Sequence, residues 1–341
     1  MTLDARKKLI LESIIKDYVE TAEPVGSRTV VKKHALNISP ATVRNEMADL
    51  EEMGYLEQPY TSAGRIPSQM GYRYYVDCMM EKEALSDKEI EILQKILQDN
   101  IHEWNEVIEK VSYFLAQVTS YASFVIFPSV SLSHFKYLQI LPIEENKALV
   151  IAVTDSGLIM HRKIDVPESV TPGDLETIGK AMNKVFSGRR LNDISRSDLR
   201  MIRDSLRRRK KFIDKVLDAV EYILTTSEEE RLVISGTLNI LNEPEFKDLE
   251  KLKKILALLD EGVLFKSIVP EDVTDEVEIR IGTENKIEGV KEISLVVSGY
   301  NTLGQRGKIG VIGPIRMEYW KAAGTVETVG KILEEILKER F

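Results

Sequence analysis

Cysteine is nearly absent from this 341-residue sequence. The single Cys78 excludes an intramolecular disulfide and a zinc site built from several cysteines, and it favours a cytoplasmic location. The four histidines show no HExxH spacing, so we expect no metal site. No apolar run reaches the roughly 18 residues that a membrane helix needs, and the charged amphipathic start of the chain does not read as a signal peptide. We therefore expect no association with a membrane.

Catalytic motifs are also missing. The stretch ISGTLNI lacks the G-x-S-x-G elbow of a nucleophilic serine. The glycines of GQRGKIGVIGP match neither the P-loop nor the dinucleotide fingerprint, which favours turn and strand-end roles for them. The cations of the run RRRKK (207–211) alternate with apolar positions, as on a solvated helix face. We expect no catalytic residue, no cofactor and no enzymatic activity.

Length and charge leave room for several domains and for a local basic surface. The chain has the length of two or three domains, and 43% apolar with 30% charged residues is typical of a soluble globular protein. The formal net charge of −8 argues against a protein that coats nucleic acid generally. It does not exclude a basic patch, because phosphate contacts are made locally.

The first eighty residues predict three helices in close succession. An apolar stripe at helical spacing predicts a helix that ends near Pro24, because proline cannot continue it. Ser27 is expected to cap a short second helix in VGSRTVVKKH. The third, SPATVRNEMADLEEMG, has Ser39 as N-cap, Pro40 at its first position and Gly54 as its stop.

The third predicted helix has a narrow polar face. Val43, Met47 and Leu50 form its inward face, and on a helical wheel three positions lie opposite, with two more on the flanks. The opposite positions are Ala41, Asn45 and Ala48, and the flanking positions are Thr42 and Arg44. Small residues with hydrogen-bonding neighbours suit insertion into a major groove about 12 Å wide.

A predicted β-ribbon follows the third helix. YLEQPY and RIP are its strands and TSAG is its loop, with Gly64 permitting the turn. Thr61, Ser62 and Arg65 are expected to point donors at phosphates or into the adjacent minor groove. The order of helices and ribbon is that of a winged helix-turn-helix. Residues 1–80 hold ten basic and eleven acidic side chains, but the cations fall mostly around these elements, at Arg28, Lys32, Lys33, Arg44, Arg65 and Arg73.

The rest of the chain predicts an α+β, multidomain protein. Ser86 and Glu89 form a capping box that opens a helix. Three strand-like runs, FKYLQILPI, KALVIAVT and LIMHRKIDV, predict a meander that precedes helices up to about residue 225. The runs alternate poorly and read as apolar, so one face must meet helices or a second subunit. Further strands are predicted in RLVISGTLNIL, EVEIRIG, EISLVVSGY and GKIGVIG. Helices are predicted after the first of these stretches and after the last. This order suggests that residues 129–228 are inserted into another domain.

The sequence resembles the heat-inducible transcription repressor HrcA family. The matching stretches are LDARKKLILESIIKDYVETAEPVGSRTV, ISPATVRNEMADLEEMGYLEQPYTSAGRIPSQMGYRYYVD and GVIGPIRMEYWKAAGTVETVGKIL, with ALVIAVTDSGLI and EISLVVSGY between them. The resemblance covers essentially the full length. Tyr60 departs from it, since a histidine is expected before TSAGRIP.

The resemblance implies a homodimeric repressor that binds an inverted-repeat operator in double-stranded DNA upstream of chaperone operons, with the GroE chaperonin as its positive modulator. It implies three domains: a winged helix over residues 1–90, a GAF-like α/β domain over 91–128 and 229–341, and a dimerisation domain inserted at 129–228. The expected DNA-binding residues are Arg28, Ser39, Thr42, Arg44, Asn45, Thr61, Ser62, Gly64 and Arg65.

Two other functions remain open at this stage. One is a metabolite-responsive winged-helix regulator that binds a small molecule in its GAF-like domain, although the sequence shows no pocket chemistry that demands it. The other is a structural adaptor whose winged helix binds protein. A ligand that stabilises the chain and changes operator affinity would favour the first, and weak salt dependence of DNA binding would favour the second.

Overall fold

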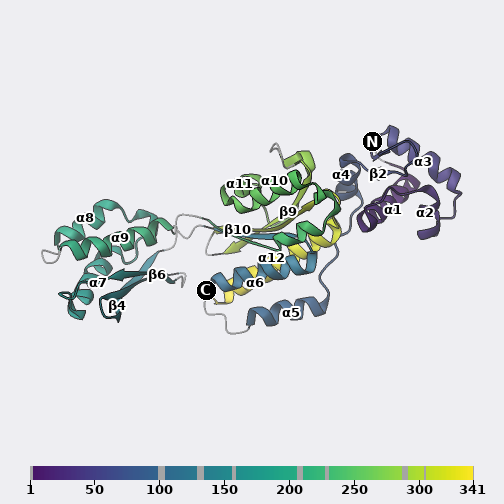
Figure 1. Ribbon diagram of the computed structural model, residues 1–341. Helices are drawn as coiled ribbons and strands as arrows, with labels where there is room; N and C mark the ends of the chain where they lie inside the picture. The colour runs from purple at the N-terminus through teal and green to yellow at the C-terminus, as the bar shows by residue number, and fades with distance from the viewer. Residues whose placement is uncertain are drawn as a thin grey trace. The chain divides into compact units, whose positions relative to one another are not determined.

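The computed structural model describes residues 3–98, 104–128, 134–155, 159–205, 210–226, 230–285, 291–302 and 305–340 (Figure 1). It is a mixed α and β structure with three sheets. The chain divides into two compact units. The first comprises Met1–Val125, Val233–Tyr300 and Lys308–Leu333, and the second comprises Ile126–Leu232, Asn301–Gly307 and Glu334–Phe341. The second unit thus interrupts the first in the sequence.

The N-terminal part of the first unit has the predicted order of elements. They are α1 (Ala5–Thr21), α2 (Ser27–Lys33), α3 (Pro40–Glu52), the ribbon strands β1 (Leu56–Glu57) and β2 (Ile66–Pro67), and α4 (Gln69–Cys78). Helix α1 ends before Pro24, at a left-handed Ala22. The prediction that Ser27 caps α2 is wrong. Gly26 occupies the cap position, and Ser27 is the buried first residue of the helix.

The apolar stripes of α1 and α3 form the core of this N-terminal part. Ile10, Leu11, Ile14 and Ile15 of α1 are fully buried. The three inward positions predicted for α3, Val43, Met47 and Leu50, are buried as well. Helical periodicity therefore places the opposite face of α3 on the outside.

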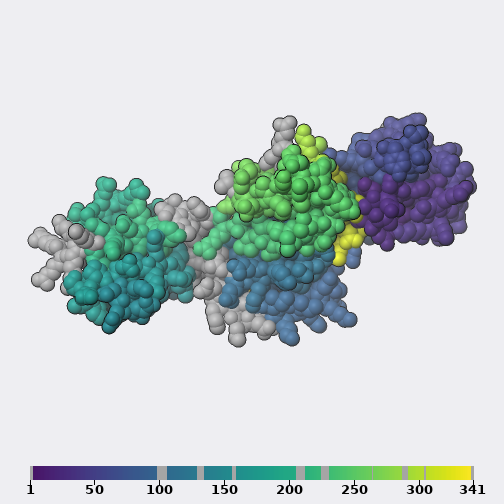
Figure 2. All heavy atoms as spheres, in the orientation of Figure 1, coloured from purple at the N-terminus to yellow at the C-terminus, as the bar shows by residue number. Residues whose placement is uncertain are grey.

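The remainder of the first unit is built around a five-stranded sheet. The strands run in the order β7–β3–β10–β9–β8, and α10 and α11 lie on one face while α6 and α12 lie on the other (Figure 1). Helices α10 and α11, in green, cover the upper surface of this unit in the space-filling view (Figure 2). The helices are α5 (Asp87–Gln98), α6 (Trp104–Thr119), α10 (Leu249–Asp260), α11 (Gly262–Ile268) and α12 (Tyr319–Arg340). The strands are β3 (Ala122–Phe127), β7 (Arg231–Ser235), β8 (Glu278–Ile281), β9 (Ile293–Thr302) and β10 (Gln305–Pro314).

Two predictions for this region need correction. RLVISGTLNIL is not one strand, because β7 ends at Ser235 and the 3-10 helices η2 (Thr237–Asn242) and η3 (Pro244–Lys247) follow. Gly310 lies inside β10 and not at a turn or strand end. A Cβ there would come within 2.3 Å of the Val296 carbonyl oxygen and 2.7 Å of the Phe124 ring, so close packing explains the glycine. A further 3-10 turn, η4 (Gly282–Asn285), links β8 to β9.

The second unit packs helices on one face of a three-stranded sheet. Its strands β4 (Phe135–Glu144), β5 (Lys147–Thr154) and β6 (Ile159–Asp165) pair antiparallel in chain order, as predicted. The helices are α7 (Pro172–Phe186), η1 (Leu191–Asp193), α8 (Arg196–Ser205) and α9 (Lys210–Thr226). The expectation of poor alternation is wrong for β5, although β4 does alternate irregularly. Every second residue of β5 is buried, and these residues join the helices in one core.

Part of the basic run 207–211 lies outside the described residues, since the structure describes none from 206 to 209. The inward residues predicted near it, Ile213 and Leu217, are buried in α9. In the described part of the chain, no helix combines the length and the apolar character needed to cross a membrane.

Candidate nucleic-acid interface

Helix α3 begins at a rigid, polar N-terminus. Ser39 Oγ accepts a hydrogen bond from the Thr42 amide at 3.1 Å, and the two hydroxyls lie 2.9 Å apart. Pro40 occupies the first helical position, as predicted, and the helix ends at Glu52, with Met53 as its C-cap just before a left-handed Gly54. The cap satisfies one of the free amides at the start of the helix. This end of α3 is therefore ordered without help from a ligand.

The outward face of α3 carries side chains without partners. Ala41, Arg44 and Asn45 are exposed, and Ala48 is half-buried. Within the described part of the chain, Arg44 and Asn45 take part in no side-chain hydrogen bond or ion pair. Both side chains are free to meet a ligand on this face, which is the arrangement predicted from the helical wheel.

Two carboxylates of α3 are paired with cations of α1. Lys7 of α1 binds Glu46 at 2.6 Å and Asp49 at 3.0 Å, and Arg6 binds Glu46 at 3.3 Å. The bond to Glu46, followed by that to Asp49, raises the pKa of the Lys7 ammonium, so it stays charged. Helix α1 thus neutralises two of the four carboxylates of α3, whereas Glu52 is exposed without a partner among the described residues.

Helix α2 adds a second exposed basic side chain. Arg28 is exposed and has no partner among the described residues. Lys33 is not available in the same way, because it binds the nearly fully buried Asp17 at 2.8 Å. His34 also lies 3.0 Å from that carboxylate. These contacts hold α2 against α1, and the opposite side of α2 faces solvent.

The ribbon loop is short and closed by its own hydrogen bonds. The Gln58 side-chain amide donates to the carbonyls of Thr61 and Ala63, both at 3.1 Å. Thr61 and Ser62 are exposed at the tip, as predicted, beside Tyr60, which is 63% exposed.

The reason predicted for Gly64 is wrong. Its φ is not in the left-handed region that favours glycine. A Cβ at this position would lie 2.4 Å from the Val25 carbonyl oxygen. Glycine is needed because the chain before α2 passes directly against the ribbon there.

Arg65 does not project from the loop tip as predicted. Its backbone pairs with Val25 through two hydrogen bonds of 2.9 Å. Its guanidinium lies 2.7 Å from a Glu51 carboxylate oxygen of α3, and its side chain is only 19% exposed. Arg65 therefore ties the ribbon to α2 and α3. The sequence shows that Glu51 is present, but it does not show that this carboxylate lies beside Arg65.

Arg73 also differs from the sequence-based expectation. It belongs to the cations predicted around the helix-turn-helix, but it binds the Glu284 carboxylate through two nitrogens, each at 3.0 Å. Glu284 lies 211 residues away in the chain, so no local pattern could have revealed this pair. Three of the six predicted cations, Arg28, Lys32 and Arg44, are exposed and unpaired among the described residues.

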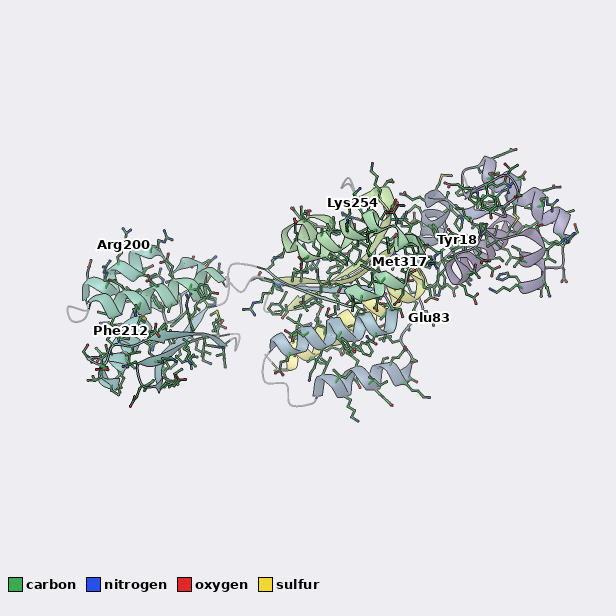
Figure 3. All side chains as sticks on the ribbon, viewed as in Figure 1. Tyr18, Glu83, Arg200, Phe212, Lys254 and Met317 are labelled. Carbon is green, nitrogen blue, oxygen red and sulfur yellow. The ribbon has the colours of Figure 1, made fainter. Side chains whose placement is uncertain are left out.

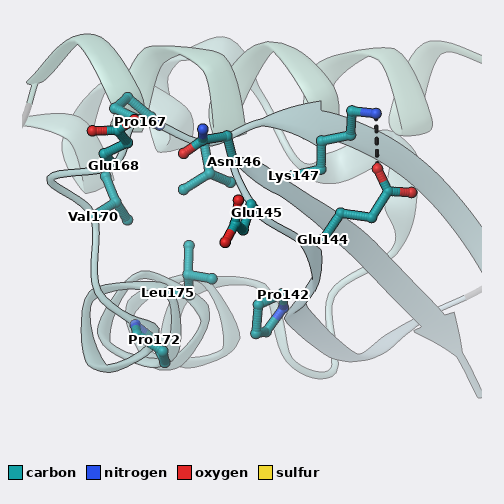
Figure 4. Close-up of a pocket in the computed structure, with 11 residues that line it drawn as sticks. Pro142, Glu144, Glu145, Asn146, Lys147, Pro167, Glu168, Val170, Pro172 and Leu175 are labelled. Carbon is teal, nitrogen blue, oxygen red and sulfur yellow. Dashed lines mark hydrogen bonds and ion pairs between the residues drawn. The ribbon is translucent and has the colours of Figure 1, made fainter.

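The cavities of the described chain show little chemistry for a cofactor. One of about 400 Å³ lies in the second unit between the β4–β5 turn and the start of α7 (Figure 4). Glu144 and Lys147 at its edge bind each other at 2.8 Å. Another, of about 350 Å³, lies beside α10 and is lined by Thr237, Leu256, Ala257, Leu259 and Asp260. Within the described residues, no three His, Cys, Asp or Glu side chains form a group that could hold a metal ion.

A family profile and full-length relatives of this chain carry the same description, HrcA. A family profile, the HrcA protein C terminal domain, matches residues 105–323. The heat-inducible transcription repressor HrcA of Pelotomaculum thermopropionicum is 42% identical over 99% of this chain and 98% of its own length. The HrcA of Desulforudis audaxviator is 44% identical over 100% of both chains. A crystal structure of a hypothetical protein, 21% identical and covering 99% of each chain with a TM-score of 0.71, shares the fold. The chain therefore belongs to the HrcA family of heat-inducible transcription repressors, which are not enzymes.

Proposed function

We propose that this heat-shock transcription repressor binds double-stranded DNA through a winged helix-turn-helix in residues 1–90. Helix α3 enters the major groove, and the loop between β1 and β2 lies against the adjacent backbone or minor groove. The observation that carries the proposal is the outward face of α3, where Arg44 and Asn45 are exposed without partners among the described residues, while α1 neutralises Glu46 and Asp49 of the same helix.

The free side chains suit two kinds of DNA contact. Arginine pairs with the major-groove edge of guanine and asparagine with that of adenine, so Arg44 and Asn45 are the candidates for base readout. Arg28, Ser39 and Thr42 lie nearer the start of the helices, where backbone amides and cations favour phosphate. Thr61 and Ser62 supply hydroxyls at the loop tip. The role of Arg65 and Gly64 in this proposal is to hold the loop in place.

We propose further that the chain acts as a homodimer, because one sheet face in the second unit is largely apolar and no helix of the described residues covers it. The helices cover the face of β5 that holds Ala148, Val150 and Ala152. On the other face the cross-strand rows are Tyr137–Val153–Ile159, Gln139–Ile151–His161 and Leu141–Leu149–Lys163. Six of these nine residues are apolar, and Tyr137 and Ile159 are 49% and 61% exposed. A second copy of this face is a suitable cover, because a two-fold interface buries the same patch on both subunits.

A two-fold dimer explains why the operator should be an inverted repeat. Two copies of α3 related by a two-fold axis read the same sequence in opposite directions, and their half-sites lie whole helical turns of about 34–36 Å apart. Repression then follows from occlusion of the promoter. Within this proposal residues 129–228 form the dimerisation domain, and residues 91–128 with 229–341 form a GAF-like domain that joins it to the winged helix. The family resemblance adds the GroE chaperonin as a positive modulator.

Footprinting on the DNA upstream of the chain's own gene tests the proposal. We expect two protected half-sites related by a dyad, and stronger protection when purified GroE chaperonin is added. If a dyad is protected and chaperonin does not change the protection, operator binding is supported and modulation by GroE is contradicted. Absence of any protected dyad at low salt, with or without chaperonin, would contradict the proposal.

A further inference from the structure

The N-terminal part of the first unit is fastened to the sheet-containing part by a buried arginine. Arg316 follows β10, and its side chain is only 11% exposed. Its Nε lies 2.6 Å from a Glu245 carboxylate oxygen and its Nη2 lies 2.8 Å from Glu243. The remaining nitrogen, Nη1, donates to the Val19 carbonyl oxygen of α1. All three guanidinium nitrogens are thus engaged, and one of them binds the N-terminal part.

The contact with Val19 completes the end of helix α1. The last four carbonyls of a helix lack partners within the helix, and Val19 lies two residues before the end of α1 at Thr21. Helix α1 has no basic residue of its own in its last turn. Arg316 supplies both the hydrogen bond and the positive charge that this helix terminus favours. Figure 3 labels Tyr18 and Met317, the neighbours of the two bonded residues, where these segments meet.

The surroundings of Arg316 are largely buried and partly aromatic. Tyr72 of α4 and Tyr319 of α12 pack edge to face, with ring centroids 5.8 Å apart, and they are 1% and 0% exposed. Burial raises the pKa of the Glu243 carboxyl, and Arg316 opposes this rise. An arginine held in such a site keeps a fixed geometry, because releasing it would leave two carboxylates and a carbonyl without their partner.

Two further contacts limit rotation about this point. Arg73 of α4 binds Glu284 through two nitrogens, and it also donates to the Ile279 carbonyl at 2.6 Å. Gln69, at the start of α4, donates to the Ile281 carbonyl at 2.8 Å. Arg316 holds the end of α1, and the contacts of Gln69 and Arg73 hold α4 against the edge strand β8 and the turn that follows it.

We propose that Arg316 is a positioning residue for operator binding. It holds α1 against the sheet-containing part of the chain, and through α1 it sets the direction in which α3 faces. Two such units in a dimer then present their recognition helices at one separation, which makes the repressor selective for half-site spacing. The inference rests on the proposed function, since it requires a dimer that binds two half-sites.

The experiment measures affinity against half-site spacing. Operator duplexes carry the same two half-sites at the native separation, and with two, five and ten base pairs added or removed. A duplex with one half-site gives the affinity of a single unit. The variants are Arg316→Met, which keeps the length of the side chain without its charge, and Arg316→Lys. Arg189→Met is the matched control, because Arg189 binds the similarly enclosed Asp198 at 2.9 Å within the second unit.

The wild-type protein and the control should bind the native spacing at least about tenfold more tightly than the shifted ones, since two linked sites act together only when the geometry allows. Arg316→Met should lose most of this preference and keep its affinity for one half-site. Arg316→Lys should recover part of it through the bond to Val19. A spacing profile of Arg316→Met identical to that of wild type would overturn the inference.

A second variant and a fluorescence measurement complete the experiment. If Arg316→Met does not fold, Glu245→Gln weakens the same contact while preserving the shape of the side chain, and an unchanged spacing profile in a folded Glu245→Gln protein contradicts the inference. Failure of the wild-type protein to bind any operator duplex would instead contradict the proposed function. In a Trp104→Phe background Trp320 is the sole tryptophan. Its ring packs on Tyr75 of α4 at 6.1 Å, so altered Trp320 fluorescence in the Arg316 variants is expected.

Discussion

At the scale of single residues, ion pairs decide which cations can reach DNA. Lys7, Arg65 and Arg73 each bind a carboxylate within the protein, whereas Arg28 and Arg44 are exposed without one. An arginine already bound to a carboxylate must break that bond before it contacts phosphate. Under the proposed function we therefore expect Arg28 and Arg44 to contribute most to DNA binding.

Arg44→Ala is expected to cost about 1–3 kcal/mol at one base pair of the operator and to relax specificity there. The reason is the loss of a two-point contact with a base edge. Arg28→Ala is the comparison, and it should weaken operator and random DNA alike. Fluorescence anisotropy with both duplexes measures the difference. Equal losses on the two duplexes for Arg44→Ala would rule out base readout by Arg44.

Gly64→Ala is expected to lower the free energy of unfolding by about 1–3 kcal/mol, because a Cβ cannot fit against the backbone without displacing it. The added atom would lie 2.4 Å from the Val25 carbonyl oxygen. Gly173→Ala is the control, since its nearest neighbour is 3.8 Å away, in the first turn of α7. Urea unfolding of the two variants gives the comparison. Equal free energies of unfolding for Gly64→Ala and Gly173→Ala would show that the ribbon backbone shifts to accept the added Cβ.

At the scale of elements, capping and periodicity were reliable guides. The Ser39 cap, the Pro40 start, the capping box at Ser86 and Glu89, and the meander of β4, β5 and β6 are all present. These features depend on neighbours a few residues apart, so a single sequence contains them. Ser27 and the run after β7 were misread because several local signals competed. A serine beside a glycine offers two possible caps, and an apolar run can continue as a 3-10 helix.

Ile151→Glu tests the outward face of the β4–β5–β6 sheet. Ile151 occupies the middle row of that face, between Gln139 and His161. A carboxylate buried in the middle of an apolar interface should weaken self-association at least about tenfold, because it must be taken out of water. Sedimentation equilibrium measures the shift toward monomer. Glu176→Lys, on the exposed side of α7, should leave the dimer intact. A dimer that survives the change at Ile151 would place the interface elsewhere.

At the scale of the whole molecule, the number of protomers bound to DNA determines how steeply the binding constant depends on salt. The logarithm of the binding constant should fall with the logarithm of salt concentration by about 0.9 for each phosphate neutralised on B-DNA. A dimer on two half-sites neutralises twice as many phosphates as one unit. We therefore expect the slope for wild type on the full operator to be about twice that of monomeric Ile151→Glu on one half-site. Similar slopes would mean that only one unit of the dimer contacts DNA.

The sequence by itself determined the order of helices and ribbon at the N-terminus, the inward and outward faces of α3, and family membership through its long matching stretches. These depend on the chemistry of residues close together in the chain. The tertiary structure alone decided which cations are free, why Gly64 must be glycine, and which sheet face stays uncovered. It also revealed Arg316, whose bond to Val19 spans 297 residues. Ion pairs and close approaches depend on distances that arise only after the chain has folded, and the spacing of residues along one sequence does not contain those distances.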